Sequence, residues 1–73
     1  MNDITEGWVI QRADGKFYKG VSINGNVFIN SIRQAFIYCY DHLAKEEIEF
    51  SKLKKCKVVK VEIRVVREVS NGI

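Results

Sequence analysis

Two dipeptides of the tight-turn type divide the first thirty residues of this chain. Asp14-Gly15 and Asn24-Gly25 each lie between short runs of β-branched and aromatic residues. Tight hairpin turns need positive φ angles, which Gly, Asn and Asp adopt most readily. The flanking residue types are those that strands prefer. The sequence therefore predicts a three-stranded antiparallel meander over residues 7–30, with Gly20 marking a bulge or kink in its second strand.

A further strand is predicted near the C-terminus. From Val59 to Val65, apolar residues alternate with charged ones. This period of two is typical of a strand with one buried face and one solvated face. The alternation breaks at Val65-Val66, which predicts a bulge or the end of the strand at that point.

The segment between the meander and this strand has two interpretations. The first is a single helix over residues 31–49, because it contains neither Gly nor Pro. That helix would carry one apolar stripe at helical spacing, formed by Ile32, Phe36, Cys39 and Leu43.

The second interpretation divides the same segment into a turn over residues 31–35, a short strand over residues 36–40 and a helix from His42 to about Lys54. The run 36–40 is aromatic, β-branched or Cys throughout, which suits a strand. Asp41 would cap the helix, whereas a position inside a helix does not favour Asp. We favour this second interpretation.

Together these elements predict a single α+β domain over residues 1–73. We expect a twisted, mostly antiparallel sheet of four to five strands with one helix packed on one face. Residues 1–6 and 70–73 are expected to be frayed ends. The apolar side chains expected on the helix are Ala44, Ile48 and Leu53, with Leu43 and Phe50 at the margins of this face.

Composition indicates a cytoplasmic protein. No apolar run approaches the roughly 18 residues of a membrane span, and the N-terminus carries no secretory signal pattern. Cys39 and Cys56 are too few for a disulfide scaffold. We expect both to be free thiols that pack as small apolar groups.

The sequence offers little that would support catalysis. Cys39 and His42 are three residues apart, and a thiol beside an imidazole is a candidate nucleophile, but no third group that would orient the pair is marked. With Cys56 they are also the only soft metal ligands, and no Cys-x-x-Cys motif occurs. No phosphate-binding glycine loop is present. We therefore predict no enzyme, no cofactor and no metal.

Charge is distributed unevenly along the chain. Residues 52–73 contain seven basic and two acidic side chains, whereas residues 1–51 are net negative. Clustered cations of this kind could contact phosphates, and we expect two of them, Lys60 and Arg64, to share the solvated face of the last strand. The candidate nucleic-acid contacts are Lys55, Lys57, Lys60, Arg64 and Arg67.

Tyrosines suggest a protein-binding surface instead. Tyr18, Tyr38 and Tyr40 are expected on the outer face, with Phe17 and Phe36 directed inward. Tyrosine is favoured in interfaces because its ring is apolar and its hydroxyl is polar. A domain this small would also gain stability from self-association, so a homodimer is a further possibility.

Several segments carry a resemblance to a known group of proteins. They are Trp8–Gln11, Asp14–Gly20, Ser31–Tyr38, Ala44–Glu46 and Val58–Ile63. In these segments the chain resembles small proteins encoded by phages and prophages of Gram-positive bacteria. Those proteins share an opening hairpin, an Ala-containing helix and a closing valine-rich strand.

This resemblance implies no catalytic residue. It implies a binder that inhibits or redirects a host protein, including components of host defence systems. We therefore expect a non-catalytic binding protein, encoded by a phage, that acts on a host or phage protein. The alternative is a small nucleic-acid binder that uses the basic C-terminal third.

Overall fold

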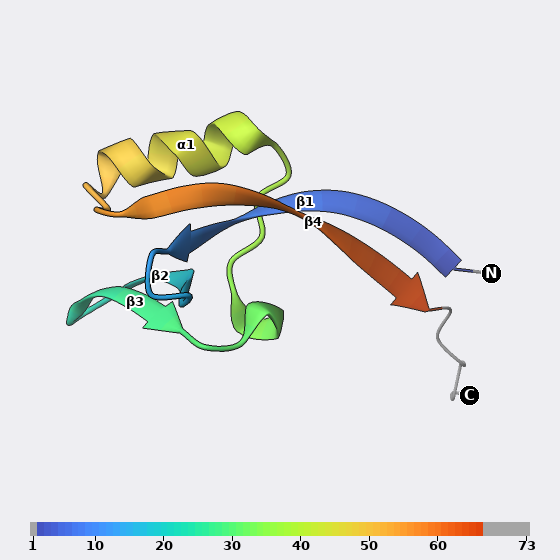
Figure 1. Cartoon of the computed structure of the whole chain (residues 1–73), viewed down its shortest axis with the longest axis horizontal. Coiled ribbons are helices and arrows are strands. Elements are labelled where there is room, and N and C mark those ends of the chain that lie inside the picture. The colour runs from blue at the N-terminus through green and yellow to red at the C-terminus, as the bar shows by residue number, and fades with distance from the viewer. Residues whose placement is uncertain (1, 67–73) are drawn as a thin grey trace.

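Four antiparallel strands and one helix make up the fold (Figure 1). The computed structural model describes residues 2–66, and for residues 2–4 and 64–66 it describes the backbone. The strands are β1 (Asn2–Arg12), β2 (Phe17–Ser22), β3 (Gly25–Ile29) and β4 (Cys56–Val66), in the sheet order β3-β2-β1-β4. A 3-10 turn, η1 (Ile32–Gln34), and the helix α1 (Asp41–Phe50) connect β3 to β4. The predicted α+β fold is confirmed.

The predicted meander is present as β1, β2 and β3. Gly15 and Gly25 both have positive φ angles, of 93° and 110°. In the first turn, Oδ1 of Asp14 accepts a hydrogen bond from the Lys16 amide at 3.1 Å. In the second, Ser22 lies opposite Gly25, so Gly25 opens β3 instead of occupying the tip of the turn. The two glycines therefore allow the chain to reverse direction twice within 20 residues.

The irregularity predicted at Gly20 is confirmed. The register between β2 and β3 shifts between Tyr18 and Gly20, and Gly20 has a φ of 140°. A non-glycine residue would be strained in this conformation. The bulge therefore depends on glycine at this position.

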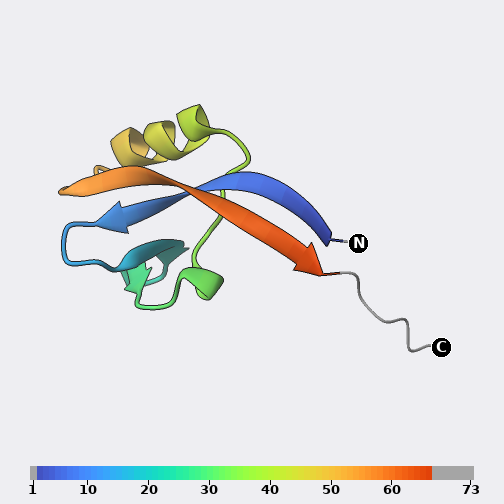
Figure 2. The ribbon, with the colours of Figure 1, turned by 45° about the vertical axis from the view of Figure 1, so that its right-hand side comes forward.

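Strands β1 and β4 are longer than the sequence pattern indicates. Residues 2–6, expected to be frayed, belong to β1 and pair with residues 62–66 of β4. The pairing runs without interruption from Asn2 opposite Val66 to Arg12 opposite Cys56, so no bulge occurs at Val65-Val66 within the described residues, of which Val66 is the last. The expected frayed end at 70–73 lies outside the described residues. Figures 1 and 2 show this long strand pair extending beyond β2, β3 and α1.

The middle segment follows the divided interpretation, with three corrections. Ser31 caps η1, because its Oγ accepts a hydrogen bond from the Arg33 amide. Residues 36–40 are extended but do not form a strand; a single bridge joins Tyr38 to Trp8. Tyr40 occupies the N-cap of α1 without a side-chain hydrogen bond, and Asp41 is already helical. The predicted Asp41 cap and the predicted helix end near Lys54 are therefore wrong.

The core lies between α1 and one face of the sheet. It centres on Ile10, Tyr18, Ala44 and Leu53, with Ile48, Cys56 and Val58 among the half-buried side chains packed against it. Successive strand residues point to opposite faces, so the even-numbered residues of β1 and β4 near the helix face α1. The expected inner positions Ala44, Ile48 and Leu53 are confirmed, although Leu53 lies beyond the helix end.

Three side-chain placements differ from expectation. Tyr18, expected on the outer face, is only 1% exposed. Phe36, expected inside, is exposed, and so is Cys39. Phe17 is half-buried. Phe17 lies opposite Gln11 in the register of β1 and β2, which places Tyr18 on the same face as Ile10. Residues 36–40 form a single bridge and no strand, so a two-residue alternation does not direct Phe36 or Cys39.

The opposite face of β1 and β4 is covered by η1 and the segment that follows it (Figure 2). Val9 on this face is fully buried. Gly7 lies so close to Ile37 that a Cβ atom at position 7 would be 2.6 Å from Cγ2 of Ile37. The absence of a side chain at Gly7 is therefore what lets residues 36–38 cross β1 at this point.

Candidate functional site

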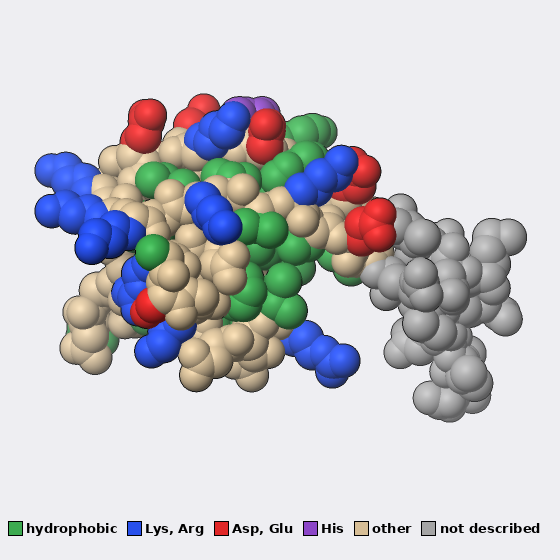
Figure 3. Space-filling view, in the orientation of Figure 1, with side chains coloured by type: hydrophobic (Ala, Val, Ile, Leu, Met, Phe, Trp, Pro, Cys, Tyr) green, Lys and Arg blue, Asp and Glu red, His purple; other side chains and the backbone are tan. Residues whose placement is uncertain are grey.

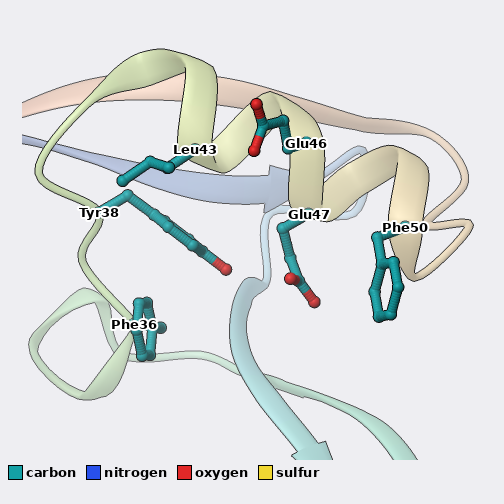
Figure 4. A pocket seen from close by; sticks show the side chains of 6 residues that line it. All are labelled: Phe36, Tyr38, Leu43, Glu46, Glu47 and Phe50. Atoms are coloured by element: carbon teal, nitrogen blue, oxygen red, sulfur yellow. The ribbon is translucent and has the colours of Figure 1, made fainter.

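An apolar groove lies between α1 and the extended segment 36–40 (Figure 4). The segment contributes Phe36 and Tyr38, and the helix contributes the other lining residues. The groove has a volume of ≈ 440 Å³. The helical lining residues follow the spacing i, i+3, i+4, i+7, which places them on one face of a helix. They are Leu43, Glu46, Glu47 and Phe50.

The wall formed by residues 36–38 is held by backbone hydrogen bonds. The Trp8 amide donates to the Tyr38 carbonyl at 3.0 Å, and the Tyr38 amide donates to the Trp8 carbonyl at 2.8 Å. The Phe36 amide donates to the Tyr18 carbonyl at 3.1 Å. The rings of Phe36 and Tyr38 pack with their centroids 4.6 Å apart. Two strands of the sheet therefore fix the position of these aromatic side chains.

Three apolar side chains that line the groove are exposed. Phe50 is 85% exposed, Phe36 is 52% exposed and Leu43 is 39% exposed. Beside the groove, Tyr40 is 59% exposed, and its ring stacks on His42 with the centroids 5.6 Å apart. Contiguous exposed apolar side chains on a small protein commonly mark an interaction surface.

Glu47 connects the groove to the core. The Tyr18 hydroxyl donates to Oε2 of Glu47 at 2.9 Å, and the Ser51 hydroxyl donates to the same oxygen. The Tyr18 hydroxyl also lies 3.3 Å from Oδ1 of Asn26. The phenol of a buried tyrosine needs such partners. One carboxylate oxygen therefore satisfies the buried tyrosine, and Glu47 contributes negative charge to the groove.

Two tyrosines near Glu47 have raised pKa values. Burial, together with the negative charge of Glu47 and the neighbouring Tyr18, raises the pKa of Tyr38 to about 12. Burial also raises the pKa of Tyr18; a hydrogen bond with Ser51 lowers it, and Glu47 raises it. Both hydroxyls therefore remain protonated, and so able to donate hydrogen bonds, at neutral pH.

Acidic side chains border the groove. Glu46 is exposed and Glu47 is half-buried, and both line the groove. Within the described part of the chain neither forms a salt bridge; the one on α1 joins Lys45 to Asp41 at 3.7 Å. The groove thus combines an apolar floor with uncompensated negative charge.

The tyrosines predicted as partner contacts have three different environments. Tyr40 is exposed, and Tyr38 is half-buried and lines the groove. Tyr18 is buried, so its assignment as a surface contact is wrong. Phe36, Leu43 and Phe50 were missed as a surface; the spacing of Leu43, Glu46 and Phe50 on one helix face was the available signal.

The predicted basic contacts do not form one surface. Lys55 and Lys57 are exposed at the end of the molecule where α1 leads into β4, and Figure 3 shows basic side chains gathered there. Lys60 lies farther along β4 and forms a salt bridge with Glu6, with 3.0 Å between Nζ and Oε2. Arg64 lies in β4 opposite Ile4, and Arg67 lies outside the described residues.

The remaining candidate catalytic or metal-binding residues are Cys39, His42 and Cys56. Cys39 is exposed in the segment before α1, and His42 is exposed in the first helical turn, stacked on Tyr40. Cys56 is half-buried and packs against the core, as expected of it. Among the described residues, no three His, Cys, Asp or Glu side chains are grouped so that they could hold a metal ion. In residues 2–66, no helix has the length and hydropathy needed to cross a membrane.

Comparison with protein-family models, with curated proteins and with solved structures finds no match to this chain.

Proposed function

We propose that this protein is a non-catalytic binder of another protein and that the groove formed by Phe36, Tyr38, Leu43 and Phe50 is its contact surface. The observation that carries the proposal is the exposure of these apolar side chains around a groove whose walls are fixed by the sheet and the helix. Aromatic residues in such positions commonly supply most of the binding energy of an interface. The resemblance of the sequence to phage and prophage proteins supports a host or phage protein as the partner, bound in the host cytoplasm.

The chemistry of the groove indicates what it would bind. Its floor suits one or two apolar side chains of a partner, because binding would remove apolar surface from water on both sides. Glu46 and Glu47 at its border favour lysine or arginine beside those side chains. The expected partner segment is therefore apolar with flanking positive charge.

A comparison of variants in a pull-down tests this proposal. The tagged wild-type protein, incubated in a lysate of the host, is expected to recover a stoichiometric partner that mass spectrometry identifies. Phe50→Ser should reduce recovery at least tenfold, since removal of an aromatic anchor commonly costs about 2 kcal/mol or more of binding energy. Phe50 is 85% exposed, so its replacement should leave folding intact.

Ile23→Ser provides the matched control. Ile23 is 99% exposed at the turn between β2 and β3 and does not line the groove. Its variant should recover the partner as the wild type does. Equal loss in both variants would indicate nonspecific apolar adhesion, and equal retention would rule out the groove as the contact surface.

A small nucleic-acid binder is the second candidate function. It is favoured by the exposed lysines in and after the turn between α1 and β4, none of which forms a salt bridge within the described residues. They are Lys52, Lys54, Lys55 and Lys57. This cluster could neutralise phosphates at one end of the molecule.

Salt dependence tests the second candidate. Any affinity for single- or double-stranded DNA or RNA should fall steeply as salt is raised, because each phosphate contact releases a counterion. Lys55→Glu with Lys57→Glu should weaken it further, while Lys45→Glu, on α1, should have a smaller effect. The absence of binding to all of these nucleic acids at low salt would exclude this function.

A further inference from the structure

Strand β4 forms one edge of the sheet, and no other described strand pairs with its outer side. The strand order is β3-β2-β1-β4, and β4 is 11 residues long. Outside the strand ladders, none of the backbone hydrogen bonds between described residues involves β4. An edge of this length with unpaired backbone groups is a template for pairing with another strand.

The hydrogen bonds of β1 identify which groups of β4 face outward. Trp8 exchanges both of its backbone hydrogen bonds with Tyr38, on the side of β1 away from β4. Lys60 lies directly opposite Trp8. Because antiparallel pairs alternate between hydrogen-bonded and non-hydrogen-bonded kinds, Lys60 forms a non-hydrogen-bonded pair. Its N–H and C=O therefore point to the open edge, as do those of Val58 and Glu62.

We propose that the open edge of β4 binds the β4 edge of a second copy of this chain. The two strands would run antiparallel about a two-fold axis at Val61, so that the two sheets become one. In this register all 11 residues of β4 find a partner, from Cys56 opposite Val66 of the second copy to Val66 opposite its Cys56. The outward-facing groups of Lys60 would exchange hydrogen bonds with those of Glu62 in the second copy.

Charge complementarity selects this register. Glu6 and Glu62 are directly opposite each other in one chain, and like charges in opposite positions destabilise a sheet. Lys60 already contacts Glu6 at 3.0 Å. Pairing about Val61 brings Lys60 of the second copy beside Glu62, so that each Glu62 gains an opposite charge on its open side. A shift of the axis by one residue in either direction would instead oppose Lys60 to Lys60 or Glu62 to Glu62.

Packing is compatible with the same register. Val59, Val61 and Ile63 are half-buried on the face that η1 covers in part. The register sets Val61 against Val61 and Val59 against Ile63, which removes further apolar surface from water. The core side chains of β4 that pack under α1 are Cys56 and Val58. They would lie opposite Val66 and Arg64, so the two helices would sit at opposite ends of the joined strands and would not collide.

Two charge-inversion variants test the proposal by sedimentation velocity. The wild type is expected to dimerise reversibly. Lys60→Glu and Glu62→Lys should each raise the dimer dissociation constant about tenfold or more, since each turns two attractive cross-strand pairs into repulsive ones. An equimolar mixture of the two variants should dimerise again, because every pair in the mixed dimer has opposite charges.

The mixing step separates association from folding. A variant that merely failed to fold could not be restored by mixing, and Glu62→Lys removes a like-charge pair within the chain, so it should fold at least as well as the wild type. A monomeric wild type at its highest soluble concentration would overturn the proposal. A dimer that neither variant weakens, or that mixing does not restore, would overturn the register.

A disulfide trap measures the register independently. In a Cys39→Ser, Cys56→Ser background, Val61→Cys should form an intermolecular disulfide under mild oxidation. The two residues at the axis would be a non-hydrogen-bonded pair with Cα atoms about 4.5 Å apart, within disulfide range. Lys57→Cys in the same background should not form a disulfide, because position 57 lies opposite position 65. Efficient linkage at 57 but not at 61 would contradict the proposed axis. None of these residues except Cys39 lies near the groove, so loss of the dimer and loss of partner binding are separate results.

Discussion

Tyr18 shows how one hydroxyl can join a sheet to a helix. Its side chain is 1% exposed, and its ring packs against Phe28 with the centroids 5.4 Å apart. The hydroxyl donates to Glu47 of α1. A buried phenol without a partner would be costly, so this contact favours one position of the helix over the sheet. The same carboxylate borders the groove, so the core contact also fixes one of the acidic groups that we assign to binding.

The variant Tyr18→Phe should destabilise the protein by about 1–2 kcal/mol, because it removes a hydrogen bond to a charged group and keeps the ring. Urea denaturation followed by circular dichroism measures this change. Tyr40→Phe is the matched control, since Tyr40 is 59% exposed and should change stability by less than about 0.5 kcal/mol. Similar effects of the two substitutions would contradict the assigned role of the Tyr18 hydroxyl.

The raised pKa of Tyr38 indicates that the folded protein loses stability at high pH. Burial is the main reason that its pKa in the folded protein is about 12, whereas an unfolded tyrosine titrates near a pKa of about 10. The unfolded chain therefore releases this proton first as pH rises. The contribution of Tyr38 to stability is complete below about pH 10 and is lost progressively between about pH 10 and 12.

Urea denaturation at a series of pH values checks this expectation, with the absorbance change of the phenolate followed in parallel. Tyr38→Phe should reduce the decline in stability above about pH 10, since phenylalanine does not titrate. A decline that is the same in wild type and in Tyr38→Phe would show that other groups cause it.

At the scale of elements, the end of α1 explains why the sequence pattern overextends this helix. A glycine commonly ends a helix because it adopts a positive φ without strain. Here lysines occupy such positions, with φ angles of 54° at Lys52 and 58° at Lys55. The Leu53 amide donates back to the Ile48 carbonyl at 2.9 Å, which closes the helix end and returns Leu53 to the core. No residue type signals this stop in the sequence.

Lys52→Gly should therefore increase the free energy of unfolding by roughly 0.5 kcal/mol. Glycine removes the strain of the left-handed conformation, which costs about 1–2 kcal/mol, but the unfolded chain becomes more flexible by about 0.5–1 kcal/mol. Lys54→Gly provides the comparison. Lys54 is not among the residues with positive φ, so this variant should have a lower free energy of unfolding than the wild type. Urea denaturation of both variants distinguishes them; equal losses would show that Lys52 is not strained.

At the scale of the whole molecule, Gly7 determines how the connection from β3 to α1 crosses the sheet. A Cβ atom there would lie 2.6 Å from Cγ2 of Ile37 and 3.2 Å from Cδ1 of Ile63. The crossing brings Tyr38 into its bridge with Trp8, and with it one wall of the groove. A close approach in the middle of β1 thus controls the shape of a surface on the helix side of the sheet.

Gly7→Ala should destabilise the fold by about 1–3 kcal/mol, as expected when atoms are added to a packed site. The second variant Ile37→Ala should relieve the clash, so the double variant should lose less stability than the two single variants together. Thermal unfolding of the four proteins measures this coupling. Additive losses would show that the contact between positions 7 and 37 is not limiting.

The four strands and their order along the chain could be predicted from local patterns, although the same patterns also predicted a strand over residues 36–40 that does not form. Gly15, Gly20 and Gly25 have positive φ angles that only glycine adopts without strain, and the alternation in β4 specifies a half-buried strand. These signals depend on a residue and its immediate neighbours. The basic character of residues 52–73 follows from their composition alone.

Tertiary structure decided which side chains became surface. Tyr18 is inside because the register of β1 and β2 places it on the face of Ile10. Phe36 is outside because its segment is held by a single bridge and by a hydrogen bond to the Tyr18 carbonyl. Both placements depend on contacts between distant residues. The groove forms only where residues 36–38 meet α1. The outer edge of β4 is unpaired because β4 is the last strand in the sheet order and pairs only with β1. A local pattern can therefore predict a strand or a turn, but burial and exposure are properties of the packed molecule.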